Sequence, residues 1–366
     1  MNPLRCVATA AMVALMVVSL ALSSAHAVTY ELVPVGNPGN ANDPATGGIY
    51  GGVGYEYQIV KYVVTIGQYT EFLNAVAKTD TYSLYNGNMA TVLNIAGISQ
   101  SGSSGSYTYS VISNGGNSAN RPITFVSWFD SARFANWVAN GQPTGIQTGT
   151  TTENGAYNVN GATSGNAPAR NVTNPNTSAP PTFYIPTENE WYKAAYYSPV
   201  LNSGSGGYYT YATQSNAAPG NVIGSAANQA NYNNGVYSVT QSASYSATQN
   251  YLTNVGAFTN SASFYGTFDQ SGNVYQWNDL DGLASSGSSR GLRGGYWDNP
   301  NTPIILSSSH SDTGDPSFED ISLNFTKLPS FRLASPVAVP EPSTWVMGLA
   351  GIACAGCGAY RRRKRA

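Results

Sequence analysis

The sequence predicts a loop-rich fold of short helices and short strands, followed by one apolar helix near the C-terminus. Three observations lead to this prediction. Turn-forming residues are abundant, with 39 Gly and 20 Pro among 366 residues. Three segments carry the pattern of a capped helix start. Residues 343–360 are uncharged, and a helix of that length would span about 27 Å, close to the apolar thickness of a membrane.

Charge and sulfur content exclude several classes of protein. Charged residues make up 9% of the chain and the net charge is −2, so we expect no basic surface for nucleic acid. A hydrophobic fraction of 42% with six Trp indicates a packed core. Cys6, Cys354 and Cys357 all lie in the terminal regions. The body between them therefore has no disulfide, Cys-ligated metal or Cys nucleophile.

The first 27 residues have the pattern of a secretory signal peptide. Arg5 supplies positive charge, residues 7–22 are apolar, and Ala25-His26-Ala27 fits a small-x-small cleavage site. Cleavage before Val28 would leave His310 as the only histidine. Residues 28–54 then form an N-terminal lead-in.

The first elements of the body are a strand and a helix. Residues 55–64 are rich in aromatic and β-branched side chains and predict a strand. Thr65 and Gln68 have the spacing of a capping box, in which each side chain bonds the backbone N–H of the other residue. Apolar residues then recur at helical spacing up to Val76.

Two further helices follow the same pattern. Residues 123–126 predict a short apolar strand or an extended segment, and Ser127 with Asp130 begins a helix that ends near Asn140-Gly141. Residues 142–181 read as a long polar insertion. Thr187 and Glu190 form the third capping box.

The C-terminal half reads mainly as turns and short extended segments. Residues 201–249 are rich in Tyr, Asn, Ser and Gly without periodicity, which predicts loops. Two Gly-centred turns, 271–273 and 293–295, lead into aromatic segments and predict tight corners. Residues 330–334 predict the last strand of the body.

Charged side chains that could act in catalysis have simpler explanations. Glu188 and Glu190 lie in the first turn of a helix, where its dipole favours negative charge. The acidic cluster between Asp312 and Asp320 fits no calcium-loop pattern and reads as a solvated loop. His310 lies in a Ser-rich stretch and reads as a solvated loop histidine.

The C-terminal tail resembles the PEP-CTERM sorting signal of Gram-negative bacteria. Its parts are the linker 335–342 with Pro340, Glu341 and Pro342, the apolar segment 343–360 as a transmembrane helix, and the basic cytoplasmic tail 361–366. The resemblance implies an exported protein that is held in the membrane before exosortase-type machinery cuts it. The product would reach the cell surface or the extracellular matrix.

The body, residues 55–334, resembles the sulfatase-modifying factor family, which contains the formylglycine-generating enzyme. The segments that carry the resemblance are 62–65 with 68–69 and 72–76, 126–132, 186–191, 272–277, 293–295 and 331–334. The resemblance implies an α+β, C-type-lectin-like fold with little regular secondary structure. That fold suits the loop-rich composition.

The sequence departs from this family at the copper site. The family's oxidase uses two cysteines shortly after Arg-Gly-Gly, because thiolates are the ligands that Cu(I) prefers. Residues 296–304, which follow that motif here, contain no Cys. We therefore expect no copper and no formylglycine-generating activity, and we assign no catalytic or cofactor-binding residue.

Calcium is the second metal that the resemblance implies. Family members hold it with oxygen ligands around a Gly-Asn-Val-x-Glu-Trp turn and an upstream Asn. The matching positions are Asn273, Gln276 and Asn231. Gln276 stands in place of the Glu and removes one negative charge from a site for a hard cation. A calcium site at these residues is a hypothesis.

Three functions remain open from sequence. The first is a non-catalytic surface module whose Tyr- and Asn-rich loops bind exopolysaccharide or a surface protein. The second is an enzyme of unrecognised chemistry in the family cleft, near Arg293, Trp297 and Arg332. The third is a structural component of the matrix without a ligand.

Overall fold

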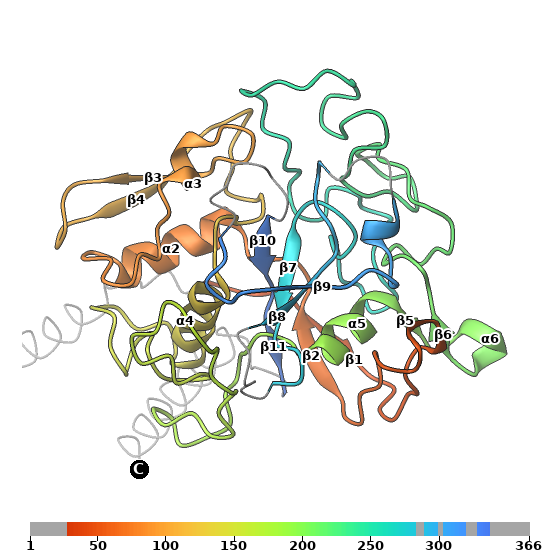
Figure 1. Ribbon diagram of the computed structural model, residues 1–366, viewed down its shortest axis with the longest axis horizontal. Helices are drawn as coiled ribbons and strands as arrows, with labels where there is room; N and C mark the ends of the chain where they lie inside the picture. Colours follow the sequence, from red (N-terminus) through yellow and green to blue (C-terminus); the bar gives the residue numbers. More distant parts are fainter. Residues whose placement is uncertain (1–27, 283–288, 299–302, 320–327, 337–366) are drawn as a thin grey trace, which may run out of the picture.

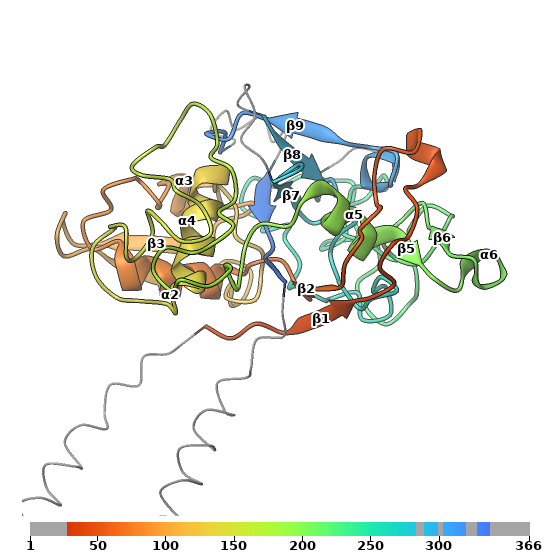
Figure 2. The ribbon, with the colours of Figure 1, turned by 90° about the horizontal axis from the view of Figure 1, so that it is seen from below.

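Two sheets and two hairpins organise the chain. The computed structural model describes residues 28–282, 289–298, 303–319 and 328–336. Within them, one sheet has the strand order β1-β2-β11 and a second has the order β10-β7-β8-β9. Figures 1 and 2 place helices α2 and α4 on one side of the second sheet, and α5 with the β5-β6 hairpin on the other.

The first sheet joins the two ends of the described chain. Strand β2 (Tyr57–Val60) pairs antiparallel with β1 (Leu32–Val35) on one side and with β11 (Ala334–Ser335) on the other. The lead-in before residue 55 therefore contributes a strand to the body.

The second sheet lies in the core. Strand β7 (Tyr275–Asn278) pairs parallel with β10 (Pro329–Phe331) and antiparallel with β8 (Arg290–Arg293), which also pairs with β9 (Asp312–Gly314). Every residue of β7 and β8 is buried. Polar side chains on these strands must therefore find partners inside the protein.

All three predicted helix starts are confirmed. Helices α2 (Ile66–Val76), α4 (Trp128–Ala139) and α5 (Glu188–Tyr196) each begin with a complete capping box. The first two pack through aromatic rings: the centroid of Phe134 lies 5.1 Å from Phe72 and 5.2 Å from Phe331. This contact joins α2, α4 and β10.

The remaining elements are short. They are η1 (Pro44–Thr46), α3 (Asn88–Thr91), β3 (Ile98–Ser101), β4 (Thr108–Val111), β5 (Tyr197–Ser198), α6 (Leu201–Gly204), β6 (Gly207–Tyr208) and η2 (Pro303–Leu306). Residues 142–181 contain no helix or strand, as the sequence predicts.

Several strand predictions need correction. The strand expected over 55–64 covers only β2, and that expected over 330–334 divides into β10 and β11 around Arg332. Residues 123–126 form no strand, because Phe125 has a φ of 58°, which is outside the extended region. Its ring is buried in the core.

The membrane helix expected at 343–360 and the Pro340-Glu341-Pro342 motif lie outside the described residues. In the part of the chain that the structure describes, no helix is both long enough and apolar enough to cross a membrane.

Candidate functional site

The two Gly-centred turns meet in the core. Gly272 has a φ of 85° and Gly294 a φ of 101°, which only Gly adopts readily. The Gly272 N–H donates to the Gly294 carbonyl at 2.7 Å. A Cβ atom at Gly272 would collide with the backbone of Asn231. The prediction of two tight structural corners is therefore confirmed.

Asn273, which follows the first turn, belongs to a buried amide network. Its Oδ1 accepts from Asn231 Nδ2 at 2.9 Å and from the Thr253 N–H at 3.2 Å, and its Nδ2 donates to the Thr253 carbonyl at 3.2 Å. Asn231 Nδ2 also donates to the Tyr251 carbonyl at 2.9 Å. Asn231 and Asn273 thus contact each other, and their side-chain amides make hydrogen bonds within the core.

Gln276 faces a different set of partners. Its Oε1 accepts from Arg332 Nε at 2.7 Å and from Trp191 Nε1 at 3.0 Å, while its Nε2 donates to the Asp269 carbonyl at 2.5 Å. A calcium ion at this oxygen would lie beside a guanidinium and would compete with two N–H donors. Asn231, Asn273 and Gln276 do not fit a calcium site in this arrangement.

Arg332 braces the backbone. It is fully buried and donates to the carbonyls of Val60 at 3.1 Å and Phe268 at 2.6 Å. Burial lowers the pKa of Arg332 to about 9, and the nearby Asp269 opposes this shift. The guanidinium thus ties β2 and the loop before β7 to the link between β10 and β11.

Arg293 is also held internally. It pairs with Glu188 and donates to the carbonyls of Ser308 at 3.1 Å and His310 at 2.8 Å. Its guanidinium lies 4.8 Å from the ring centroid of Tyr192. Trp297, the third residue considered for catalysis, is 1% exposed.

Both glutamates lie in the first turn of α5, as predicted, and each also has a partner in the core. Glu190 caps its helix as expected, and it also accepts from the Tyr184 hydroxyl at 2.7 Å. Glu188 lies in the first turn, but it is buried between Arg293 and Asn278. Its ion pair with Arg293 joins α5 to β8, and its hydrogen bond from Asn278 joins α5 to β7. Helix periodicity alone does not indicate these contacts.

Two residues assigned to solvated loops are better packed than expected. Glu319 accepts from Asn86 Nδ2 at 2.6 Å. Burial and the neighbouring Asp130 raise the pKa of Glu319 to about 8. His310 is partly buried, with Nε2 3.2 Å from the Tyr275 hydroxyl. Among the described residues, no group of three or more His, Cys, Asp or Glu is placed to hold a metal ion.

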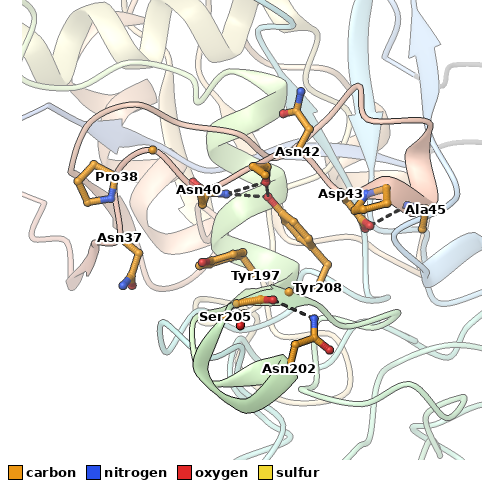
Figure 3. Close-up of a pocket in the computed structure, with 15 residues that line it drawn as sticks. Asn37, Pro38, Asn40, Asn42, Asp43, Ala45, Tyr197, Asn202, Ser205 and Tyr208 are labelled. Carbon is orange, nitrogen blue, oxygen red and sulfur yellow. Dashed lines mark hydrogen bonds between the residues drawn. The ribbon is translucent and has the colours of Figure 1, made fainter.

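A polar cleft opens away from these turns, between the lead-in and the β5-β6 hairpin. It has a volume of about 750 Å³ and is shown in Figure 3. Fifteen residues line it: Asn37, Pro38, Gly39, Asn40, Ala41, Asn42, Asp43, Pro44, Ala45, Tyr197, Asn202, Ser205, Gly206, Gly207 and Tyr208.

Hydrogen bonds fasten the two walls of the cleft together. The Tyr208 hydroxyl donates to the Ala41 carbonyl at 2.7 Å and accepts from Asn40 Nδ2 at 2.7 Å. Asp43 Oδ2 accepts from the Tyr192 hydroxyl at 2.6 Å. The cleft is therefore formed before a ligand arrives, which lowers the entropy cost of binding.

Three polar residues of the lining are exposed to solvent: Asn37, Asn202 and Ser205. Asn37 Oδ1 accepts from the Tyr265 hydroxyl at 3.1 Å, and Asn202 Nδ2 donates to the Gly206 carbonyl at 2.9 Å. Asp43 is the only charged residue among those that line the cleft. The lining therefore suits a polar ligand without negative charge.

Sequence reasoning missed this cleft because its walls are far apart in the chain. Asn40 and Tyr208 are separated by 168 positions. The only local signal was the run Asn37-Pro38-Gly39-Asn40-Ala41-Asn42 in the lead-in, a composition that predicts turns as readily as a site.

Comparison with known families gives two matches. A model of the sulfatase-modifying factor enzyme 1-like domain matches residues 53–325. A model of the PEP-CTERM protein-sorting motif matches residues 338–364. No curated protein matches the chain.

Solved structures give distant likenesses. The crystal structure of CarF is 20% identical with a TM-score of 0.46, covering 85% of this chain and 100% of that one. Treponema denticola variable protein 1 is 16% identical with a TM-score of 0.47, covering 86% and 98%. PvdO from Pseudomonas aeruginosa is 14% identical with a TM-score of 0.38, covering 85% and 93%.

Proposed function

Because this chain belongs to the sulfatase-modifying factor enzyme 1-like family, we propose that it is a non-catalytic member that binds polysaccharide outside the cell. The sorting motif implies export and recognition by exosortase machinery in a Gram-negative bacterium. We further propose that a signal peptide is removed before Val28 and that the cut protein reaches the cell surface or matrix.

The composition of the family's reactive region supports a role without catalysis. Residues 296–304 hold no thiol, so they lack the ligands that copper oxidation needs. Arg293 and Arg332 are bonded to carboxylate, amide and carbonyl groups inside the core. A family scaffold can keep its fold while its function moves to another site.

The observation that carries the proposal is the cleft between the lead-in and the β5-β6 hairpin. It combines tyrosine rings with amide and hydroxyl groups, and it is open enough for sugar residues. Such a lining matches sugars, whose hydroxyls need donors and acceptors and whose C–H faces pack on rings. With Asp43 as the only charge in the lining, a neutral polysaccharide is favoured over a uronate polymer.

Three alternatives have distinct requirements. A surface protein as ligand would bury far more area than the cleft offers. An enzyme in the family cleft would require a reactive side chain facing substrate, and Arg293 and Trp297 are both 1% exposed. A purely structural matrix component would bind neither polysaccharide nor protein in the cleft.

Affinity electrophoresis tests the proposal. The tag-free body, residues 28–336, is run through gels that contain dextran, a neutral β-glucan or polygalacturonate. We expect retardation by a neutral polymer and not by polygalacturonate. Ser205→Phe, which fills the cleft at one of its lining residues, should reduce the retardation, whereas Ser164→Phe at an exposed position outside the lining should leave it unchanged. Equal retardation of both variants would refute binding in the cleft.

A further inference from the structure

Three aromatic rings form a stack that runs from the core to the surface. The centroids of Trp297 and Tyr251 lie 4.6 Å apart with an interplanar angle of 7°, and those of Tyr251 and Tyr245 lie 5.9 Å apart at 13°. Trp297 and Tyr251 are each 1% exposed, whereas Tyr245 is 48% exposed. The stack therefore ends in a ring that faces solvent.

The outer ring is fixed in place although its loop has no regular secondary structure. The Tyr245 hydroxyl donates to Asn94 Oδ1 at 2.8 Å. Asn94 Nδ2 in turn donates to the carbonyls of Ser246 at 2.8 Å and Gln249 at 3.0 Å. The Ser246 N–H donates to the Tyr251 hydroxyl at 2.8 Å. Both the ring and its loop are thus anchored to the buried Asn94.

The residues beside Tyr245 in the sequence are small or polar, and burial and the nearby carboxylate of Asp298 raise the pKa of the Tyr245 hydroxyl. The segment that carries Tyr245 is Ser242-Ala243-Ser244-Tyr245-Ser246-Ala247-Thr248, and its other side chains are hydroxyls and methyl groups. A protein partner would favour an apolar centre of several side chains. An exposed flat ring in a segment of hydroxyl side chains instead matches a sugar, which presents C–H groups on one face and hydroxyls at its edge.

We propose that Tyr245 is a stacking platform for a pyranose ring of a polysaccharide, at a second site distinct from the cleft. No residue of the stack lines the cleft. Because Tyr251 and Asn94 already fix the ring, a sugar that packs on it costs little side-chain entropy. Two separate contacts on one body would raise the avidity for a repeating polymer.

Tyr55 provides the matched comparison. It is 47% exposed, close to the value for Tyr245. Its ring meets Tyr57 edge-on at 69°, and its hydroxyl donates to Glu190 Oε1 at 2.9 Å. Tyr55 is therefore an exposed, hydrogen-bonded tyrosine that does not end a parallel stack.

The test measures dissociation constants for dextran and the neutral β-glucan with the body carrying Ser205→Phe, so that the cleft is blocked. In this background we expect Tyr245→Ala to weaken binding about 3- to 10-fold, the range for loss of one aromatic stacking contact. Tyr245→Phe keeps the ring and should stay within about twofold of the parent. Tyr55→Ala should have no effect. Thermal unfolding checks that every variant folds.

Three results would overturn the platform. They are unchanged binding after Tyr245→Ala, an equal loss after Tyr55→Ala, and no binding of either polysaccharide by the body that carries Ser205→Phe. The two proposed sites also fail separately. If Ser205→Phe alone abolishes binding, the platform is refuted and the cleft stands. If Tyr245→Ala abolishes binding in the otherwise unchanged body and Ser205→Phe does not, the cleft is refuted.

Discussion

Replacing Asn273 with Asp tests whether hydrogen bonds or a bound cation hold the two Gly turns together. The two side chains have the same shape, so Oδ1 of the aspartate can still accept from Asn231 Nδ2 and from the Thr253 N–H. The other oxygen can no longer donate to the Thr253 carbonyl, which the amide reaches at 3.2 Å. The substitution thus replaces a hydrogen bond to the Thr253 carbonyl with repulsion between two oxygens. It also places a negative charge at a position that is 1% exposed.

The size of the effect follows from these contacts. A buried charge without a cationic partner costs about 3–5 kcal/mol, and an unsatisfied buried carbonyl costs about 1–3 kcal/mol. The two remaining N–H donors offset part of this penalty. We expect a net loss of about 4 kcal/mol in the free energy of unfolding at pH 8, a large share of the roughly 5–15 kcal/mol of a typical domain.

The loss should shrink at low pH. Burial raises the pKa of a carboxyl above its ordinary value, so the folded variant binds a proton that the unfolded chain releases. Its relative stability therefore improves as the pH falls through that raised pKa. The protonated carboxyl can then donate to the Thr253 carbonyl as the amide did.

Urea unfolding at pH 5 and pH 8, with and without calcium, measures these differences. Asn160→Asp is the control, because Asn160 is exposed and has a φ of 46°, close to the 68° of Asn273. A loss below about 1 kcal/mol at pH 8 would show that the amide network matters little. Stabilisation of the unchanged protein by calcium would mean that a cation occupies this place, whereas recovery of the variant alone would show only that the new carboxylate binds one.

Three further predictions concern pH, copper and the tail. Burial and Asp130 raise the pKa of Glu319 from 4.5 to about 8, so the free energy of unfolding should fall as the pH rises across that window. In urea unfolding, Glu319→Gln should reduce this fall. If the free energy of unfolding of the variant and of the unchanged protein varied with pH in the same way, the prediction would be contradicted. The purified body, given copper, oxygen and a Cys-containing sulfatase peptide, should produce no mass change in the peptide, and turnover would refute the assignment. Glu341→Ala should keep the chain in the membrane fraction on immunoblots, whereas release equal to that of the unchanged chain would argue against cleavage at this motif.

Helix starts could be predicted because their contacts are local. Each capping box joins residues three positions apart, such as Ser127 and Asp130, and the pattern is visible in the sequence. The Gly turns were also predictable, since positive φ restricts the choice of residue. Strand lengths were not, because Phe125 and Arg332 interrupt extended segments for reasons of tertiary packing.

The partners of buried polar groups could not be predicted from the sequence. Arg332 donates to the Val60 carbonyl across 272 positions, and Glu188 pairs with Arg293 across 105. No repeating pattern in the sequence indicates which residues form contacts over such distances in the chain. The cleft was missed for the same reason. Its polar side chains come together only because the lead-in packs against residues that are distant in the sequence.

The shared sheet at the two ends of the body determines how tension would enter the molecule. The described chain begins and ends at the lower side of Figure 2, where β1 and β11 flank β2. A pull on a tethered tail would load Ala334, whose N–H and carbonyl both bond Tyr184, at 2.8 Å and 3.0 Å. Mechanical load on the tail would therefore pass into the segment before α5 as well as into the sheet.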